Sequence, residues 1–282
     1  FDADTEFKDV SFEADSIFTS TVFKSVLNFN ESKFLGGSSS AKDGLSFNNS
    51  EFHGVVLLNY CEFYQTDFSG VVFHENFESR DARFRGNVVF DSVEFRKECD
   101  FEETEFEEDA NFSDVIFTKE ADFDETTFYG DVQFENAIFE SDAVFRGAEF
   151  LGDSRHLTDN VTFDDAQFKG PAFFDNVKFM TASFLHTEFS EVCDFEKAHF
   201  TKHVSLEIEP HTDDTLYIDM TEAEISNGTI TLDSSASVLY DMTEAVVGDI
   251  QLSTEAGSTR YQLLDYFRFC RTEFDGFEFS NH

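Results

Sequence analysis

The chain has 282 residues, of which 40 are Phe, two are Pro and none is Trp. Acidic residues outnumber basic ones 59 to 19, which gives a formal net charge of −40 at pH 7. That charge argues against a protein that binds a nucleic-acid backbone through clustered Lys and Arg, and no apolar run approaches the ~18 residues of a membrane span.

The first element is a Phe repeat that opens the sequence at residues 1–34 and is most regular at 84–150. Its Phe residues follow one another at alternating steps of five and six, so two steps make eleven and four make twenty-two. Phe therefore recurs in four columns with an offset of 22. The columns are Phe84, Phe106, Phe128 and Phe150; Phe90, Phe112 and Phe134; Phe95, Phe117 and Phe139; and Phe101, Phe123 and Phe145.

This spacing predicts a square coil of extended segments. A helix with 3.6 residues per turn would not hold Phe on one face at alternating steps of five and six. In an extended segment alternate residues share a face, so the small residue two positions before each Phe also points inward, as Ala121 does before Phe123. The charged residues that follow, such as Asp124 and Glu125, point outward and form the corners.

Two longer steps interrupt the repeat. The steps from Phe34 to Phe47 and from Phe150 to Phe163 are both thirteen, two more than a pair of ordinary steps. Gly and Ser crowd the first gap, and Gly, Asp and Ser the second. We expect surface loops at 35–46 and 151–162, within a Phe-rich β-helix that spans 1–203.

The next segment, residues 204–258, keeps the same offset with few Phe residues. The sequence DMTEA at 219–223 returns at 241–245, and Ile230 and Leu252 share one phase. These coils are expected to continue the solenoid around an aliphatic core.

The last segment, residues 259–282, is expected to cap the solenoid or supply its last repeats. Ser258 and Thr259 precede an apolar stripe, which predicts a short capped helix. The same stretch is locally basic, and one more coil side is the alternative interpretation. The candidate cap or partner surface comprises Arg260, Tyr261, Leu263, Leu264, Phe267, Arg268 and Arg271.

The repeat unit resembles that of the pentapeptide-repeat family in its Phe-centred form. The segment Ala121-Asp122-Phe123-Asp124-Glu125 shows the small, polar, Phe, polar, polar order, and residues 110–114 and 143–147 repeat it. The resemblance implies an all-β fold, a right-handed quadrilateral β-helix. Each coil here would contain about 22 residues, which is the offset of the Phe columns. What the resemblance implies about function is limited. Some members are acidic, DNA-like rods that bind type II topoisomerases. Others resemble haloarchaeal proteins that join the repeats to a membrane, channel-like segment.

Candidate chemistry is sparse, and we expect no catalytic, cofactor-binding or metal-binding residues. The sequence has no GxSxG, HExxH or Gly-rich phosphate loop. His199, His203 and His211 lie near several Glu residues, but an extended chain would put His199 and His203 ~13 Å apart. Cys61, Cys99 and Cys193 precede Phe in the small inward slot, which indicates buried thiols in a reducing, cytoplasmic setting.

The acidic surface allows three interpretations: adaptation to high salt, DNA mimicry, and binding of divalent cations between stacked carboxylates. The leading hypothesis is a non-catalytic structural or protein-interaction scaffold from a halophilic archaeon, with another protein as its partner. One alternative is a DNA-mimic regulator of a topoisomerase or another protein with a basic groove. Another is the soluble domain of a membrane channel-like protein. A homodimer through a solenoid end is compatible with each.

Overall fold

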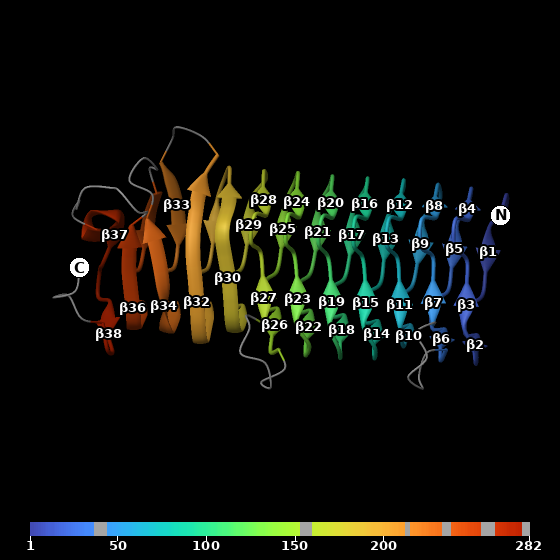
Figure 1. The fold of residues 1–282 in the computed structure, drawn as a ribbon, viewed down its shortest axis with the longest axis horizontal. Coiled ribbons are helices and arrows are strands. Elements are labelled where there is room, and N and C mark those ends of the chain that lie inside the picture. Colours follow the sequence, from blue (N-terminus) through green and yellow to red (C-terminus); the bar gives the residue numbers. More distant parts are fainter. Residues whose placement is uncertain (37–43, 153–159, 212–214, 233–237, 255–262, 278–282) are drawn as a thin grey trace.

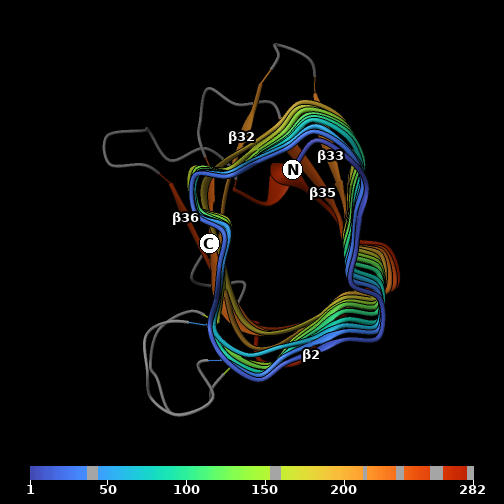
Figure 2. The same ribbon diagram turned by 90° about the vertical axis from the view of Figure 1, so that its right-hand side faces the viewer.

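The computed structural model describes residues 1–36, 44–152, 160–211, 215–232, 238–254 and 263–277. The chain winds into one elongated solenoid with its first and last described coils at opposite ends (Figure 1). Seen along its axis, the coils superpose as a four-sided ring, and the chain runs clockwise as it recedes from the N-terminal end (Figure 2). The solenoid is therefore right-handed, and every pairing between the described strands is parallel.

One side of the solenoid is a 12-stranded sheet with a single strand from each coil. Its strands, in order, are β1 (Thr5–Glu6), β5 (Leu27–Asn28), β9 (Val56–Leu57), β13 (Phe77–Glu78), β17 (Cys99–Asp100), β21 (Ala121–Asp122), β25 (Ala143–Val144), β29 (Ala172–Phe173), β31 (Cys193–Asp194), β33 (Leu216–Asp219), β35 (Val238–Asp241) and β37 (Phe267–Arg268).

The other three sides begin as separate stacks of two-residue strands. The first stack holds β2 (Ser11–Phe12), β6 (Lys33–Phe34), β10 (Glu62–Phe63), β14 (Arg83–Phe84), β18 (Glu105–Phe106), β22 (Thr127–Phe128) and β26 (Glu149–Phe150). The second holds β3 (Ser16–Ile17), β7 (Leu45–Ser46), β11 (Thr66–Asp67), β15 (Val88–Val89), β19 (Ala110–Asn111), β23 (Val132–Gln133) and β27 (Val161–Thr162). The third holds β4 (Val22–Phe23), β8 (Glu51–Phe52), β12 (Val72–Phe73), β16 (Glu94–Phe95), β20 (Ile116–Phe117), β24 (Ile138–Phe139) and β28 (Gln167–Phe168).

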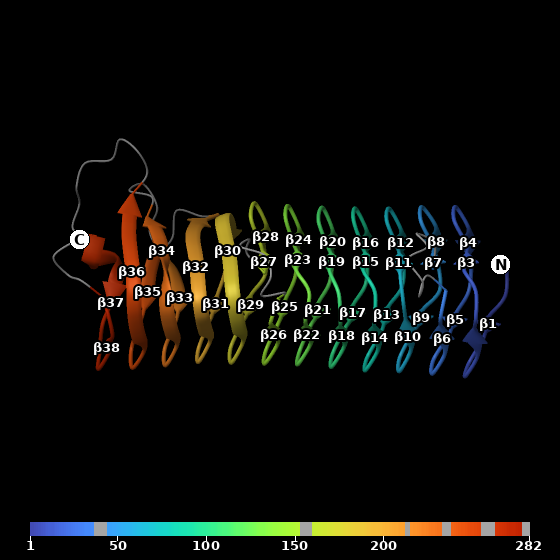
Figure 3. The ribbon, with the colours of Figure 1, turned by 60° about the horizontal axis from the view of Figure 1, so that its bottom comes forward.

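These three stacks merge in the C-terminal coils. The long strand β30 (Lys178–Phe189) pairs with β26, β27 and β28 at once, so it replaces three short strands. Long strands continue in β32 (His199–Pro210), β34 (Glu224–Leu232) and β36 (Val246–Thr254), before β38 (Glu273–Phe274) closes the stack. Figure 3 shows the change from short to long strands along the axis.

The core is a set of stacked Phe columns, as the offset of 22 predicts. Phe123 stacks at 4.9 Å on Phe101 below it and at 4.9 Å on Phe145 above it. It also meets Phe112 and Phe134 edge to face at 5.6 Å. Each such pair adds ~0.5–1.5 kcal/mol beyond the burial of apolar area. Every Phe of the four predicted columns is at most 1% exposed.

The alternation of five and six reflects two kinds of corner. In the five-residue step from Phe101 to Phe106, the Thr104 N–H donates to the Phe101 carbonyl at 3.0 Å. Glu103 lies between them with φ 56°, the left-handed position that a type II turn requires. The same turn recurs at Glu125 in the next coil. The six-residue step from Phe106 to Phe112 contains no residue of positive φ.

The spacing predicts that each of the two long gaps in the repeat holds two ordinary steps and two extra residues. This prediction is wrong. Phe34 stacks on Phe12, and Phe47 stacks on Phe18. The gap therefore replaces the single six-residue step from Phe12 to Phe18, and the insertion is seven residues rather than two. The second gap, Phe150 to Phe163, occupies the same corner. Most of the expected loops, 37–43 and 153–159, lies outside the described residues.

The C-terminal coils replace Phe by aliphatic residues and Met inside. Met220, Ile230 and Met242 are fully buried. In place of the expected helix, the structure has one 3₁₀ turn, η1 (Leu263–Tyr266), followed by β37. Residues 258–262 of the predicted helix lie outside the described residues.

Candidate interaction surface

One outward column of side chains becomes apolar in the C-terminal coils. On the 12-stranded sheet, an outward residue directly precedes each of the paired inward residues Ala172, Cys193, Ile218, Tyr240 and Phe267. We call these residues the apolar column: Pro171, Val192, Tyr217, Leu239 and, at its C-terminal end, Tyr266, which packs against the core. Val192 is 56% exposed and Tyr217 is 62% exposed, while the other three are half-buried.

Val26 and Val55 occupy the same column nearer the N-terminal end, but the column is polar and acidic in the four coils that directly precede Pro171. Its residues there are Asn76, Glu98, Glu120 and Asp142. The amide of Asn76 donates to Glu98 at 3.3 Å, and neighbouring carboxylates contribute, after burial, to raising the pKa of Glu120. The surface thus switches from charged to apolar within one coil, between Asp142 and Pro171.

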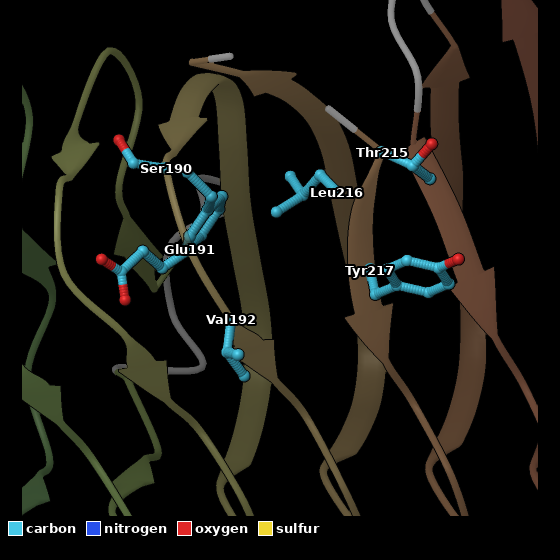
Figure 4. Close-up of a pocket in the computed structure, with 7 residues that line it drawn as sticks. Ser190, Glu191, Val192, Thr215, Leu216 and Tyr217 are labelled. Atoms are coloured by element: carbon cyan, nitrogen blue, oxygen red, sulfur yellow. The ribbon is translucent and has the colours of Figure 1, made fainter. Parts of the chain in front are cut away.

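A shallow hollow adjoins the apolar column. Its volume is about 280 Å³, and it is lined by Phe189, Ser190, Glu191, Val192, Thr215, Leu216 and Tyr217. Figure 4 shows Val192 and Tyr217 on neighbouring coils, with the side chain of Leu216 between those coils. Single exposed apolar residues are ordinary on protein surfaces, whereas a contiguous row marks a site of interaction.

The acidic coils hold closely spaced carboxylates. Burial raises the pKa of Asp124 to about 6, and the neighbouring Asp122 contributes further. The pKa of Glu103 is raised first by Asp81 and also by Glu125 in the adjacent coil. These carboxylates repel one another, so protons and screening ions favour the folded state here.

The predicted cap surface is largely engaged within the chain. Leu263 and Leu264 pack against the core, and Phe267 is buried and stacks on Tyr240 at 5.1 Å. Arg268 binds Asp241 at 2.9 Å, and Arg271 binds Glu244 at 2.5 Å. Arg260 and Tyr261 lie outside the described residues.

The three histidines singled out in the sequence do not form one cluster. His199 pairs with Glu224 at 3.2 Å, His211 with Glu188 at 3.2 Å, and His203 contacts Asn227 at 2.8 Å. Among the residues that the structure describes, none of these three belongs to a group that could share a metal ion.

The cysteines occupy two environments. Cys61, Cys99 and Cys193 are buried thiols, and Cys270 is exposed. Burial raises the pKa of Cys61 to about 12 and raises the pKa values of Cys99 and Cys193 as well. These three side chains therefore act as small core residues.

Sequence reasoning missed two features. The apolar column was hidden because the intervals between its members are 21, 25, 22 and 27, so no fixed period aligns them. Glu51, His53 and His74 lie together on the surface, although His74 belongs to a later coil than the other two. A signal for the second feature existed, since Phe-His occurs at 52–53 and again at 73–74 in adjacent coils.

Comparison with protein families agrees with this architecture. A family model described as pentapeptide repeats (9 copies) matches residues 80–127, 116–155 and 156–199. Residues 80–199 are pentapeptide repeats. The resemblance read from the repeat unit is thereby confirmed, as is the quadrilateral β-helix that it implies. No curated protein matches the sequence.

Helical structure is limited to one short element in the part of the chain that the structure describes. That element, η1, is a single 3₁₀ turn, and no helix there has the length and apolar character needed to cross a bilayer.

Proposed function

We propose that this protein is a non-catalytic scaffold that binds another protein along the apolar column. The single observation that carries the proposal is the exposure of Val192 and Tyr217 side by side on adjacent coils of a rod whose formal net charge is −40. Solenoids characteristically bind partners along an extended face. Exposed Tyr is among the residue types that contribute most to such interfaces.

The platform beneath the column favours binding. Val192 and Tyr217 directly precede the inward residues Cys193 and Ile218, which are paired in register and fully buried. Because the backbone is already ordered, association costs little conformational entropy at these positions. The flanking hollow lined by Leu216 offers space for an apolar side chain of the partner.

The acidity of the rod is consistent with life in concentrated salt, and we include a halophilic origin in the proposal. The raised pKa of Glu103 supports it, because repulsion from Asp81 is the largest cause and salt would screen that repulsion. A DNA mimic would need its carboxylates to continue along the rod. The switch from Asp142 to Pro171 therefore favours the scaffold over the mimic.

Two Tyr residues provide a matched test. Tyr217 in the column and Tyr60 in an acidic coil are both 62% exposed. We expect the double variant Val192→Ser/Tyr217→Ser to lose bound partner proteins, and Tyr60→Ser to keep them. The measurement is quantitative comparison of proteins retained by each purified, immobilised variant from native extract at matched salt, followed by binding assays with the purified candidate.

The outcomes separate clearly. Selective loss from the double variant, at unchanged thermal stability, supports binding along the column. Equal retention by both variants, or equal loss from both, would show that the column is not the docking surface. A change in oligomeric state of the double variant would identify a second copy of the chain as the partner.

A further inference from the structure

We propose that Glu51, His53 and His74 bind a divalent transition-metal ion such as Zn²⁺. The three side chains offer ligand atoms that all lie within 4.8 Å of one another. The site lies near the N-terminal end of the rod, far in sequence from the apolar column, and its function would be separate from docking along that column.

The fold brings these residues together through strand register. Glu51 and His53 flank the buried Phe52 at β8, so both point outward from the same side. Phe52 pairs with Phe73 of β12, which places His74 directly beside His53 on the next coil. The His53 N–H donates to the Phe23 carbonyl at 2.8 Å, and the His74 N–H donates to the Phe52 carbonyl at 2.8 Å. Both imidazoles therefore extend from an ordered backbone.

The side-chain geometry already approaches coordination. The two imidazole rings stack with centroids 4.1 Å apart and planes 21° from parallel. The Glu51 Oε2 atom lies 3.2 Å from His53 Nε2 and 3.9 Å from His74 Nε2. Two ligands of one tetrahedral zinc ion lie roughly 3.3 Å apart, given bonds of ~2.0–2.1 Å. Because the rings are stacked, their nitrogen lone pairs run nearly parallel, so metal binding requires one imidazole to rotate out of the stack.

The chemistry of the donors selects the class of ion. Two imidazole nitrogens and one carboxylate suit Zn²⁺, Cu²⁺ or Ni²⁺, whereas Ca²⁺ and Mg²⁺ prefer all-oxygen sites. The exposed fractions of the three side chains are 51% for Glu51, 40% for His53 and 24% for His74. Solvent thus reaches the site and can supply the fourth ligand.

The other close group of potential ligands differs both in its ion pairs and in its donor atoms. Asp100, Glu102 and Asp122 also approach one another, but Arg80 forms ion pairs with both Asp100 and Glu102. That cluster contains its own cation and only oxygen donors. We therefore propose no transition-metal site there.

One cation opposes binding at the His pair. Arg96 Nη1 lies 3.2 Å from His74 Nδ1, while Nε and Nη2 of the same guanidinium hold Glu94 at 2.9 and 3.0 Å. A metal on His74 Nε2 leaves the hydrogen on Nδ1, which cannot face a guanidinium N–H. Arg96 must then release His74 and keep Glu94. The substitution Arg96→Ala removes both this competition and a neighbouring positive charge. The variant protein should therefore bind the metal more tightly than the wild type.

The experiment is calorimetric titration of ZnCl₂ into the full chain, with MgCl₂ in excess to occupy non-specific carboxylate sites. We expect one tight Zn²⁺ per chain. His53→Ala and His74→Ala should each weaken binding by ~10-fold or more, a loss that even removal of an outer partner of a metal ligand can cause. The matched control is His186→Ala, since His186 contacts two carboxylates, Glu207 and Glu209, both at 3.3 Å.

A spectroscopic readout supports the titration. Cu²⁺ bound to the wild type should show nitrogen hyperfine structure from two imidazoles, reduced to one in His74→Ala. Thermal unfolding without metal establishes that each variant is folded. The proposal is overturned if Zn²⁺ binding vanishes in excess Mg²⁺, or if His53→Ala and His74→Ala bind Zn²⁺ like the wild type. It is also overturned if His186→Ala weakens Zn²⁺ binding as much as those two variants do.

Discussion

Asp124 shows how a single carboxylate is accommodated on this crowded surface. It follows the inward Phe123, and its Oδ1 accepts the N–H of Arg146 at 3.0 Å. Burial raises the pKa of Asp124 to about 6, and repulsion from Asp122 adds to the effect. An acceptor is thus required at this position, whereas a negative charge is unfavourable.

This leads to a pH prediction for Asp124→Asn. Because the folded-state pKa lies above the ordinary value of 3.8, the folded protein binds the proton more tightly and gains stability as pH falls from about 6 to about 4. The Asn side chain keeps the acceptor and removes the charge. We expect the variant to be more stable than wild type by about 1 kcal/mol at pH 7, a value reduced for solvent screening of a half-buried group, and to show no such gain at pH 4.

Urea denaturation at pH 7 and pH 4 measures this difference. Asp164→Asn is the control, because Asp164 accepts an equivalent bond from the Leu185 N–H at 2.8 Å and another from the Ser183 hydroxyl at 2.6 Å. That variant should gain nothing. Equal behaviour of the two variants at both pH values would refute the assigned role of the Asp124 charge.

At the scale of the element, the recurring corner turn explains the five-residue step. Asp81, Glu103, Glu125 and Gly147 occupy its left-handed position in four successive coils, with φ between 53° and 64°. Residues other than Gly are strained in this region by about 1–2 kcal/mol. In three of these four coils the left-handed position is occupied by Asp or Glu rather than Gly.

We therefore predict that Glu125→Gly stabilises the protein relative to Glu125→Ala. Both changes remove the same charge, so their difference reports the backbone alone. The relief of strain is partly offset by the greater freedom of Gly in the unfolded chain, and the net difference should be about 0.5–1 kcal/mol. Chemical denaturation of the two variants checks it. The reverse change, Gly147→Ala, should destabilise, and equal stability of Glu125→Ala and Glu125→Gly would contradict the turn assignment.

The stacking inside the solenoid was predictable where the same 22-residue spacing recurs in every coil. The offset of 22 correctly predicted that Phe101, Phe123 and Phe145 stack inside. The merger of three sides into β30 was not predictable from spacing. The step from Phe179 to Phe184 is five where six is expected, but the step from Phe63 to Phe68 is shortened in the same way, and β10 and β11 remain short. The same local spacing therefore occurs both with and without a straightened corner.

For the whole molecule, the net charge of −40 is the dominant long-range term. Like charges on neighbouring coils, such as Glu103 beside Asp81 and Glu125, repel in the folded rod more than in an extended unfolded chain. This repulsion is distributed over many coils. It should therefore depend on ionic strength more than on any one residue.

We predict that the thermal midpoint rises with NaCl or KCl, by on the order of 5 °C between ~0.1 M and ~1 M, where the Debye length falls to ~3 Å. Circular dichroism melts across that range, extended to ~3 M, measure it. A rise that continues to the highest salt supports adaptation to a saline setting. A midpoint that does not change with salt would show that the surface charge is not destabilising, and would contradict the halophilic part of the proposal.

The candidate site was less predictable than the fold because it depends on how unequal coils align. The interval from Val192 to Tyr217 is 25 and that from Leu239 to Tyr266 is 27, so a search at 22 misses them. The structure aligns them because Cys193 pairs with Ile218 and Tyr240 with Phe267. A property that arises from register across irregular coils is visible only once the pairing is known.

The unbroken parallel register has a geometric consequence. Every strand of the 12-stranded sheet pairs with its neighbours only, and adjacent strands are ~4.8 Å apart. The distance along the axis between the His53–His74 pair and Val192 therefore depends on how many coils lie between them. Gain or loss of one complete coil between them would lengthen or shorten that distance by one increment and leave both surfaces intact. Such a rod can set the spacing of two bound components in discrete steps.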